Sequence, residues 1–298
     1  MDTRTTDSRY GARAHDLGQL QAPVLVCGGV YSNLEALRAL LEAAEALSIP
    51  PRRIIHTGDA VAYCADPAES AELLRASRIH AIQGNVEQSL SASEPDCHCG
   101  FAADSTCDRL SAEWFAYADA RIGDELRQWM GRLPHYLTFE MAGVHARVIH
   151  GGVAQINRFL FASHPECAFE AEFAAADADM ILAGHSGIPF TRHMAGRAWH
   201  NSGPLGLPAN DATPRAWFSV LTAVEEGVRI EHHALDYDYE KAREKMLKAG
   251  LCRDYADTLR SGLWPSLDVL PEPERKQTGA PLDLNVPVLV WRTAPVSG

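Results

Sequence analysis

The stretch Ile54-Ile55-His56-Thr57-Gly58-Asp59 decides the fold, because a short apolar run ends there in a glycine and a carboxylate. Such a run predicts a buried strand, and the glycine lets the chain turn sharply, so that Asp59 projects from the strand's end. Three similar signals follow apolar runs further along: Gly84-Asn85, His150-Gly151-Gly152 and Gly184-His185. Because strand ends of an α/β sheet meet at a common crevice, these four side chains predict one metal site.

The donors in this set are a carboxylate, an amide oxygen and two imidazoles, which suit manganese, iron or zinc. Each also has a plainer interpretation, since Asp59 could cap a turn, Asn85 could bond loop backbone, and both histidines could be packed core residues. Their order, each after a strand, favours the metal site. The first apolar run, Val24–Cys27, also ends in glycines, but Gly28-Gly29-Val30-Tyr31 offers no obvious hard ligand.

Alternating strand and helix patterns predict an α/β fold with a mainly parallel sheet. We expect a flexible arm over residues 1–22, a domain over 23–262, and an extended tail over 263–298. Residues 91–132 interrupt the alternation and predict a helical insertion beside the site. Segments 199–201, 216–222 and 228–234 predict antiparallel strands of a second sheet.

Composition limits the range of partners. The 298 residues are 46% apolar and carry a formal net charge of −12, which makes non-specific nucleic-acid binding unfavourable. No apolar run is long enough for a membrane span or resembles a signal peptide, so a cytoplasmic location is expected. A small-molecule or protein partner fits this composition better, and the oligomeric state cannot be read from it.

Seven cysteines, an odd number, argue against a disulfide framework and favour free thiols or metal ligands. Cys97-His98-Cys99 and Cys107 lie within eleven residues, so Cys97, Cys99 and Cys107 are candidate ligands of a separate zinc ion. Their irregular spacing leaves open a reduced surface loop with reactive thiols.

The ordered motifs resemble the calcineurin-like metallophosphoesterase superfamily, in particular its compact bacterial phosphodiesterase branch. The blocks that carry the resemblance are Thr57-Gly58-Asp59, Gly84-Asn85-Val86-Glu87, His150-Gly151-Gly152, Gly184-His185-Ser186-Gly187-Ile188-Pro189 and Asn201-Ser202-Gly203-Pro204-Leu205-Gly206. The resemblance implies two mixed β-sheets sandwiched between helices, a four-layer α/β/β/α fold. It also implies a pair of divalent ions, with Asp59 bridging them and Asn85, His150 and His185 on the second.

The departures from this family pattern are concentrated at the first ion. Gly29, Tyr31 and Gly187 stand where the family has that ion's three private ligands, and Val86 replaces a histidine that contacts the phosphate. A mononuclear or otherwise atypical centre is therefore expected, with one ion or possibly two per chain. Without that histidine, a general acid must come from elsewhere or be absent.

Other candidate site residues have more than one interpretation. Tyr31 would be a substitute ligand, donate a hydrogen bond to phosphate or merely cover the first-ion position. Glu87 would orient a metal ligand or bound water, or cap a helix. His98 would supply the missing acid from the insertion or ligate an ion. Asn157 and Arg158 would contact the substrate anion, because arginine matches phosphate geometry, or Arg158 would be a surface residue.

The leading functional hypothesis is a metal-dependent phosphodiesterase or phosphomonoesterase that acts on a small phosphorylated substrate or nucleotide. The alternatives are a catalytically silent relative that binds a metal, nucleotide or protein, and an iron or manganese enzyme of different chemistry. A dinucleotide-binding oxidoreductase is disfavoured, since the glycines after Val24–Cys27 form no G-x-G-x-x-G motif.

Overall fold

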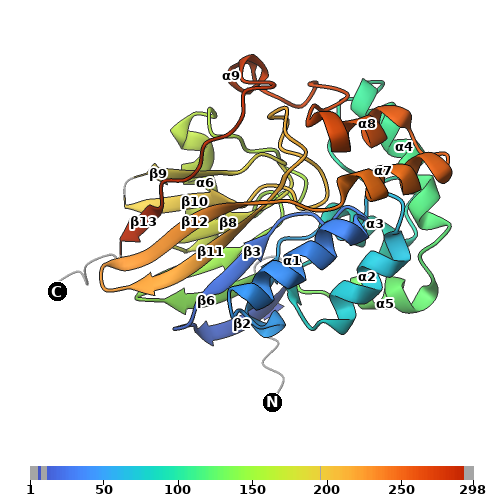
Figure 1. Cartoon of the computed structure of the whole chain (residues 1–298). Coiled ribbons are helices and arrows are strands. Elements are labelled where there is room, and N and C mark those ends of the chain that lie inside the picture. Colours follow the sequence, from blue (N-terminus) through green and yellow to red (C-terminus); the bar gives the residue numbers. More distant parts are fainter. Residues whose placement is uncertain (1–5, 8–11, 195, 292–298) are drawn as a thin grey trace.

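Two mixed β-sheets pack face to face between layers of helices in the computed structural model, which describes residues 6–7, 12–194 and 196–291 (Figure 1). The six-stranded sheet has the order β13-β12-β11-β3-β4-β5. Its strands are β3 (Val24–Cys27), β4 (Ile54–His56), β5 (His80–Ala81), β11 (Ala216–Val224), β12 (Gly227–Leu235) and β13 (Val288–Trp291). The three strands β3, β4 and β5 are parallel, and β11, β12 and β13 extend the sheet in antiparallel fashion.

The seven-stranded sheet has the order β1-β2-β6-β7-β8-β10-β9. Its strands are β1 (Thr6–Asp7), β2 (Ala12–Gln19), β6 (Tyr136–Met141), β7 (Val144–Val148), β8 (Met180–Ala183), β9 (Phe190–Met194) and β10 (Arg197–Asn201). The pairs β2/β6, β7/β8 and β8/β10 are parallel, and the remaining pairs are antiparallel.

The helices are α1 (Leu34–Ala46), α2 (Pro67–Ala76), α3 (Asn85–Ala92), α4 (Thr106–Asp119), α5 (Asp124–Met130), α6 (Glu166–Ala176), α7 (Tyr239–Lys248), α8 (Arg253–Ser261) and α9 (Glu272–Lys276). Local sequence explains α1 well. Asn33 accepts a hydrogen bond from the backbone N–H of Ala36 as its N-cap, and Leu37 and Leu40 present one apolar face to the sheet.

Three buried clusters define the layers. Val26 and Leu221 of the six-stranded sheet meet Val148 and Leu182 of the other sheet in the middle. The outer face of the six-stranded sheet packs against α1–α5, α7 and α8, and the outer face of the seven-stranded sheet packs against α6. This α/β/β/α sandwich confirms the expected fold class, and it brings strand ends from both sheets to one edge of the molecule.

Three expectations about the chain's organisation were wrong. The expected arm contains β2, which pairs with β6, and the expected tail contains α9 and the edge strand β13. Residues 199–201 belong to β10 and pair with β8, so they lie in a different sheet from β11 and β12. The errors about strands share one cause, because strand pairing is set by a distant partner strand that leaves little trace in the local pattern.

A buried histidine pair joins the two sheets. The Thr191 hydroxyl lies 2.8 Å from His200 Nδ1 and 3.1 Å from His232 Nε2, and the Ser219 hydroxyl lies 3.2 Å from His232 Nδ1. Burial lowers the pKa of both rings, that of His232 to about 4. The folded protein therefore holds both histidines neutral at neutral pH.

This pair predicts acid lability. As pH falls from about 6.5 to 4, the unfolded chain binds a proton at residue 232 that the folded chain does not, so the free energy of unfolding should fall by about 3 kcal/mol from this group alone. Urea titrations at several pH values should show a shallower pH dependence for His232→Gln than for the wild type. An equal pH dependence of the free energy of unfolding for the two proteins would refute the assignment.

No helix in the described part of the chain is long and apolar enough to cross a membrane.

Candidate metal centre

Four polar side chains converge where strands of the two sheets end. Asp59 follows β4 and Asn85 follows β5 in the six-stranded sheet, whereas His150 follows β7 and His185 follows β8 in the seven-stranded sheet. Asp59, Asn85 and His150 are at most 5% exposed. The sequence placed these residues at strand ends, but their crevice lies between two sheets instead of along one.

The four donor atoms surround one point. His150 Nε2 lies 3.0 Å from Asn85 Oδ1, 3.1 Å from His185 Nδ1 and 3.2 Å from Asp59 Oδ2. Among the described residues, Asp59, His150 and His185 are the group of three titratable side chains whose donor atoms all lie within 4.8 Å of one another. The spacing is that of ligands around a shared ion.

The hydrogen bonds around the centre show that the atoms facing one another there carry lone pairs and no hydrogen. His150 Nδ1 lies 2.7 Å from the Thr57 carbonyl oxygen, which only accepts, so Nδ1 carries the hydrogen and Nε2 presents a lone pair. Asn85 Nδ2 donates to the Cys97 carbonyl at 2.8 Å, which turns the amide oxygen toward the centre. An imidazole lone pair thus faces an amide oxygen and a carboxylate, an arrangement that a cation stabilises.

Electrostatics agree with this donor set. Burial opposes a charge on His150, but the Asp59 carboxylate outweighs it and raises the pKa of His150. Burial opposes ionisation of Asp59 as well, yet His150 lowers the pKa of that carboxyl overall. Burial lowers the pKa of His185 to about 3, with His150 adding to the effect, so His185 stays neutral. The cluster therefore attracts positive charge, and a metal ion would compete there with a proton.

Glu87 holds the ligand loops in place. Its carboxylate accepts hydrogen bonds from the backbone N–H groups of Asp59, Ala60 and Gly84 at 2.8, 2.7 and 2.8 Å. Asp59 itself has a φ of 61°, a left-handed conformation that costs free energy outside glycine. Burial and the Asp59 charge raise the pKa of Glu87 to about 7. Glu87 thus fixes a strained turn through its contacts with three backbone N–H groups.

Aromatic rings lie beside Gly29 and Gly187, two positions at which the family resemblance implies ligands of a first ion. A Cβ atom at Gly29 would overlap the ring of Tyr31, so a side chain at 29 and this tyrosine position exclude each other. A Cβ atom at Gly187 would lie 3.1 Å from the ring of Trp264. Tyr31 is 6% exposed and meets Tyr63 edge to face. An aromatic ring thus takes up the space that a side chain at either glycine would need.

This packing predicts a strong coupling between residues 29 and 31. Gly29→Ala should lower the free energy of unfolding by about 1–3 kcal/mol, as overpacked cores do. In the Tyr31→Ala background the same change should cost much less, because the ring that it strikes is gone. A double-mutant cycle from urea denaturation measures the coupling, and additive effects would show that Tyr31 does not fill this space.

Val86 supplies no replacement for the family's histidine. Its side chain is 1% exposed and belongs to the apolar cluster beneath the helices. The backbone N–H of Val86 donates to Asp59 Oδ1 at 3.3 Å, but no side-chain acid reaches the centre from this position.

The remaining candidates have their side chains engaged elsewhere. Arg158 forms an ion pair with Glu172, and Asn157 Nδ2 donates to the His98 carbonyl at 2.7 Å. The His98 ring is half exposed and lies 3.2 Å from Asp96. Roles for these three residues in substrate contact or catalysis stay predictions, and each would require a present contact to be broken.

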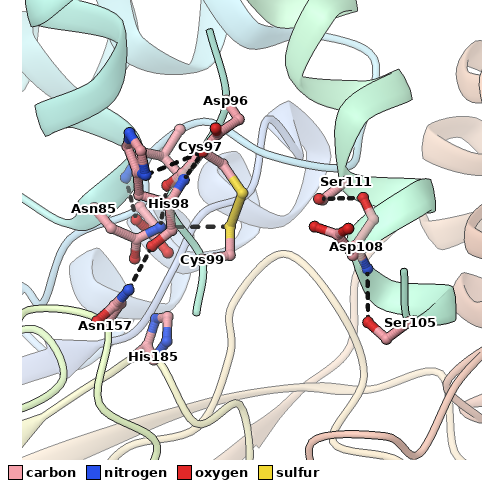
Figure 2. The surroundings of a disulfide bond; sticks show 12 residues. Asn85, Asp96, Cys97, His98, Cys99, Ser105, Asp108, Ser111, Asn157 and His185 are labelled. Carbon is pink, nitrogen blue, oxygen red and sulfur yellow. Dashed lines mark hydrogen bonds and ion pairs between the residues drawn. A yellow bond between two sulfur atoms is a disulfide. The ribbon is translucent and has the colours of Figure 1, made fainter. Parts of the chain in front are cut away.

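The cysteine cluster differs from the expectation of free thiols or a zinc site. Cys97 and Cys99 form a disulfide, with Cα atoms 5.2 Å apart (Figure 2). Cys107 is a free, buried thiol. The loop acts on the metal centre indirectly, since Asn85 Nδ2 bonds the Cys97 carbonyl and lies 3.4 Å from Cys99 Sγ. The short Cys-x-Cys spacing explains the disulfide, because it brings the thiols of Cys97 and Cys99 close to each other without help from Cys107.

A largely apolar pocket, partly open to solvent, begins at the centre. Asp59 and His185 form its base, and its other walls come from the insertion, from α8 and from the segment after it. The lining residues are Tyr31, Asp59, Tyr63, Cys99, Phe101, Cys107, Phe159, His185, Ser186, Gly187, Pro204, Leu207, Tyr255, Trp264, Pro265, Ser266 and Val269. Sequence patterns did not indicate the role of Trp264 or Phe159, because they come from segments without a motif.

An α/β/β/α sandwich with an Asp, an Asn and two His at the strand ends defines the class of metal-dependent phosphoesterases. The chain belongs to the calcineurin-like phosphoesterase superfamily, whose domain model matches residues 24–226. Membership supports metal binding and phosphoester chemistry in general.

Individual relatives agree with the fold. The uncharacterized protein MJ0912 of Methanocaldococcus jannaschii is 24% identical over 243 residues, which cover 77% of this chain and 93% of that protein. The hypothetical protein PH1004 from Pyrococcus horikoshii has a similar structure, with a TM-score of 0.68, 20% identity and coverage of 82% of this chain and 100% of that one. A metallophosphoesterase from Sphaerobacter thermophilus is also similar in structure, with a TM-score of 0.64 and 21% identity. That match covers 82% of this chain and 100% of the other.

Proposed function

We propose that the chain is a phosphoester hydrolase with a single divalent ion held by Asp59, Asn85, His150 and His185. The observation that carries the proposal is the convergence of Asn85 Oδ1, His185 Nδ1 and Asp59 Oδ2 on His150 Nε2, all within 3.2 Å. The donor set suits manganese, iron or zinc.

A bound divalent ion would supply Lewis-acid activation of water and of a phosphoryl oxygen. The chain's own residues contribute placement. The Thr57 carbonyl fixes the tautomer of His150, the Cys97 carbonyl orients Asn85, and Glu87 holds the turn that carries Asp59. Such supporting contacts position the ligands and keep the site preorganised.

The aromatic rings beside Gly29 and Gly187 and the buried Val86 also favour a second candidate, a relative that binds a metal and a ligand but catalyses no reaction. A missing general acid alone removes about 10²–10⁴-fold in rate. Both candidates bind the same ion, so only the presence or absence of turnover distinguishes them.

Turnover of bis(4-nitrophenyl) phosphate by purified protein decides between them. We expect activity that is lost on treatment with EDTA and restored by Mn²⁺, Fe²⁺ or Zn²⁺. Stoichiometric metal binding without turnover of any ester would establish the silent relative. Turnover that survives complete metal removal would overturn the proposal.

A further inference from the structure

The pocket beside the metal centre has a lining unsuited to polyanions. None of the described residues that line it is lysine or arginine, and Asp59 contributes a carboxylate. Three arginines close to lining residues in the sequence are engaged elsewhere. Arg158 pairs with Glu172, Arg109 donates to the Asp104 carbonyl, and Arg260 pairs with Glu240. The whole chain carries a net charge of −12, which adds a repulsive field for polyanions.

The charge balance at the centre points the same way. A divalent ion would bring two positive charges, and Asp59 is the one carboxylate among the described residues that line the pocket, so a ligand with a single negative charge balances the site. Since a buried charge without a counter-charge is costly, the centre matches an anion of one negative charge better than a dianion.

The pocket walls are rich in aromatic rings, which suits a ligand that carries an aromatic group. Phe159 packs on the His185 ring with centroids 4.2 Å apart, and Phe101 stacks on Phe159 at 6.0 Å. On the other side, Tyr63 lies 4.8 Å from Tyr255, and Trp264 closes the pocket over Gly187. Aromatic rings favour flat apolar ligands through stacked and edge contacts.

The protic groups of the lining limit the leaving group. Apart from His185, they are tyrosines, serines and a thiol, none of which ordinarily has a pKa near neutrality. An alkoxide would leave poorly without a general acid, whereas a phenolate, whose conjugate acid has a pKa of about 10, leaves unaided more readily.

We propose that this centre acts on singly charged phosphodiesters that carry an aryl group, which the aromatic pocket binds, and that it discriminates against dianionic monoesters and nucleoside polyphosphates. In the reaction, a water oxygen bonds to phosphorus, the bond from phosphorus to the aryl oxygen breaks, and the phenolate takes up a proton from water. The products are a phosphomonoester and a phenol. This inference rests on the proposed function for its chemistry, but the ligand preference stands on the pocket alone.

Three unreactive probes test the preference by titration calorimetry on metal-loaded protein. Diphenylphosphinate is an aryl monoanion, dimethylphosphinate is a monoanion without an aryl group, and phenylphosphonate is an aryl dianion. We expect diphenylphosphinate to bind at least about tenfold more tightly than either of the others. Equal affinity for the two phosphinates would overturn the aryl assignment, and tighter binding of phenylphosphonate would overturn the charge assignment.

Two variants separate the contributions. Trp264→Ala should weaken diphenylphosphinate about tenfold without affecting dimethylphosphinate, whereas Trp291→Ala, at a tryptophan that is 59% exposed, should change neither. Ser266→Arg, at a partly exposed lining residue, should strengthen phenylphosphonate relative to diphenylphosphinate. If Trp264→Ala fails to fold, Ser266→Arg still decides whether the missing cation sets the charge preference.

Kinetics then distinguish the two proposals. With the same leaving group, bis(4-nitrophenyl) phosphate should exceed 4-nitrophenyl phosphate in kcat/KM by at least about tenfold, by the same aryl contact. Equal values would overturn the substrate preference while the hydrolase stands. The expected probe affinities together with no turnover of any ester would overturn the hydrolase while the pocket's preference stands.

Discussion

Asp59→Asn is expected to lower the affinity for the divalent ion by at least about 100-fold and to remove esterase activity. Even residues that only support a ligand change metal affinity by about 10–100-fold when replaced, and Asp59 is a donor itself. The substitution keeps the shape of the side chain and removes the charge that raises the pKa of His150. Any fold defect should therefore be small.

Thermal unfolding with and without Mn²⁺ measures this effect directly. The wild type should gain about 2.7 kcal/mol at an ion concentration 100 times its Kd, and Asp59→Asn should gain almost nothing. Asp177→Asn is a matched control, because Asp177 also has a left-handed φ, of 51°, and ends α6 away from the centre. Equal metal-induced stabilisation of all three proteins would exclude Asp59 as a ligand.

Glu87→Gln is expected to cost about 2–3 kcal/mol of stability and about 10–100-fold in metal affinity. Three backbone N–H groups point at the Glu87 carboxylate, and the amide of glutamine would set an N–H donor against at least one of them. The turn that carries Asp59 would then lose its anchor. Stability and metal affinity should fall together.

Glu274→Gln is the matched control for this variant. Glu274 is also a buried glutamate that accepts a backbone N–H, from Ser163 at 3.0 Å, but it lies on α9. We expect this change to lower stability and to leave the metal Kd unchanged. Unaltered metal affinity in Glu87→Gln, measured by calorimetry on folded protein, would contradict the positioning role.

The sequence was sufficient to predict the parts of the fold that local patterns determine. Buried strands such as Met180–Ala183 leave a continuous apolar run, and glycines beside Asp59 and His185 mark sharp turns at strand ends. The order of these signals along the chain then gave the fold class and the four residues that the structure brings together. The division of those strands between two sheets was not visible, because sheet pairing is a long-range property.

The pocket and the supporting contacts escaped prediction for a similar reason. Trp264 lies in a proline-rich segment with no periodic pattern, and only the folded chain shows that it covers Gly187. The Cys97 carbonyl orients Asn85 through a backbone contact that no residue type encodes. Loss of ligands at Gly29 and Gly187 could be read from sequence, whereas the rings that take up their space required the structure.

The metal content of the protein at saturation tests the single-ion centre most directly. After incubation with excess Mn²⁺ and removal of unbound ion, elemental analysis against quantitative amino-acid analysis should give about one ion per chain for the wild type, and close to none for Asp59→Asn. Two tightly bound ions per chain, both lost in Asp59→Asn, would contradict the account of a single-ion centre.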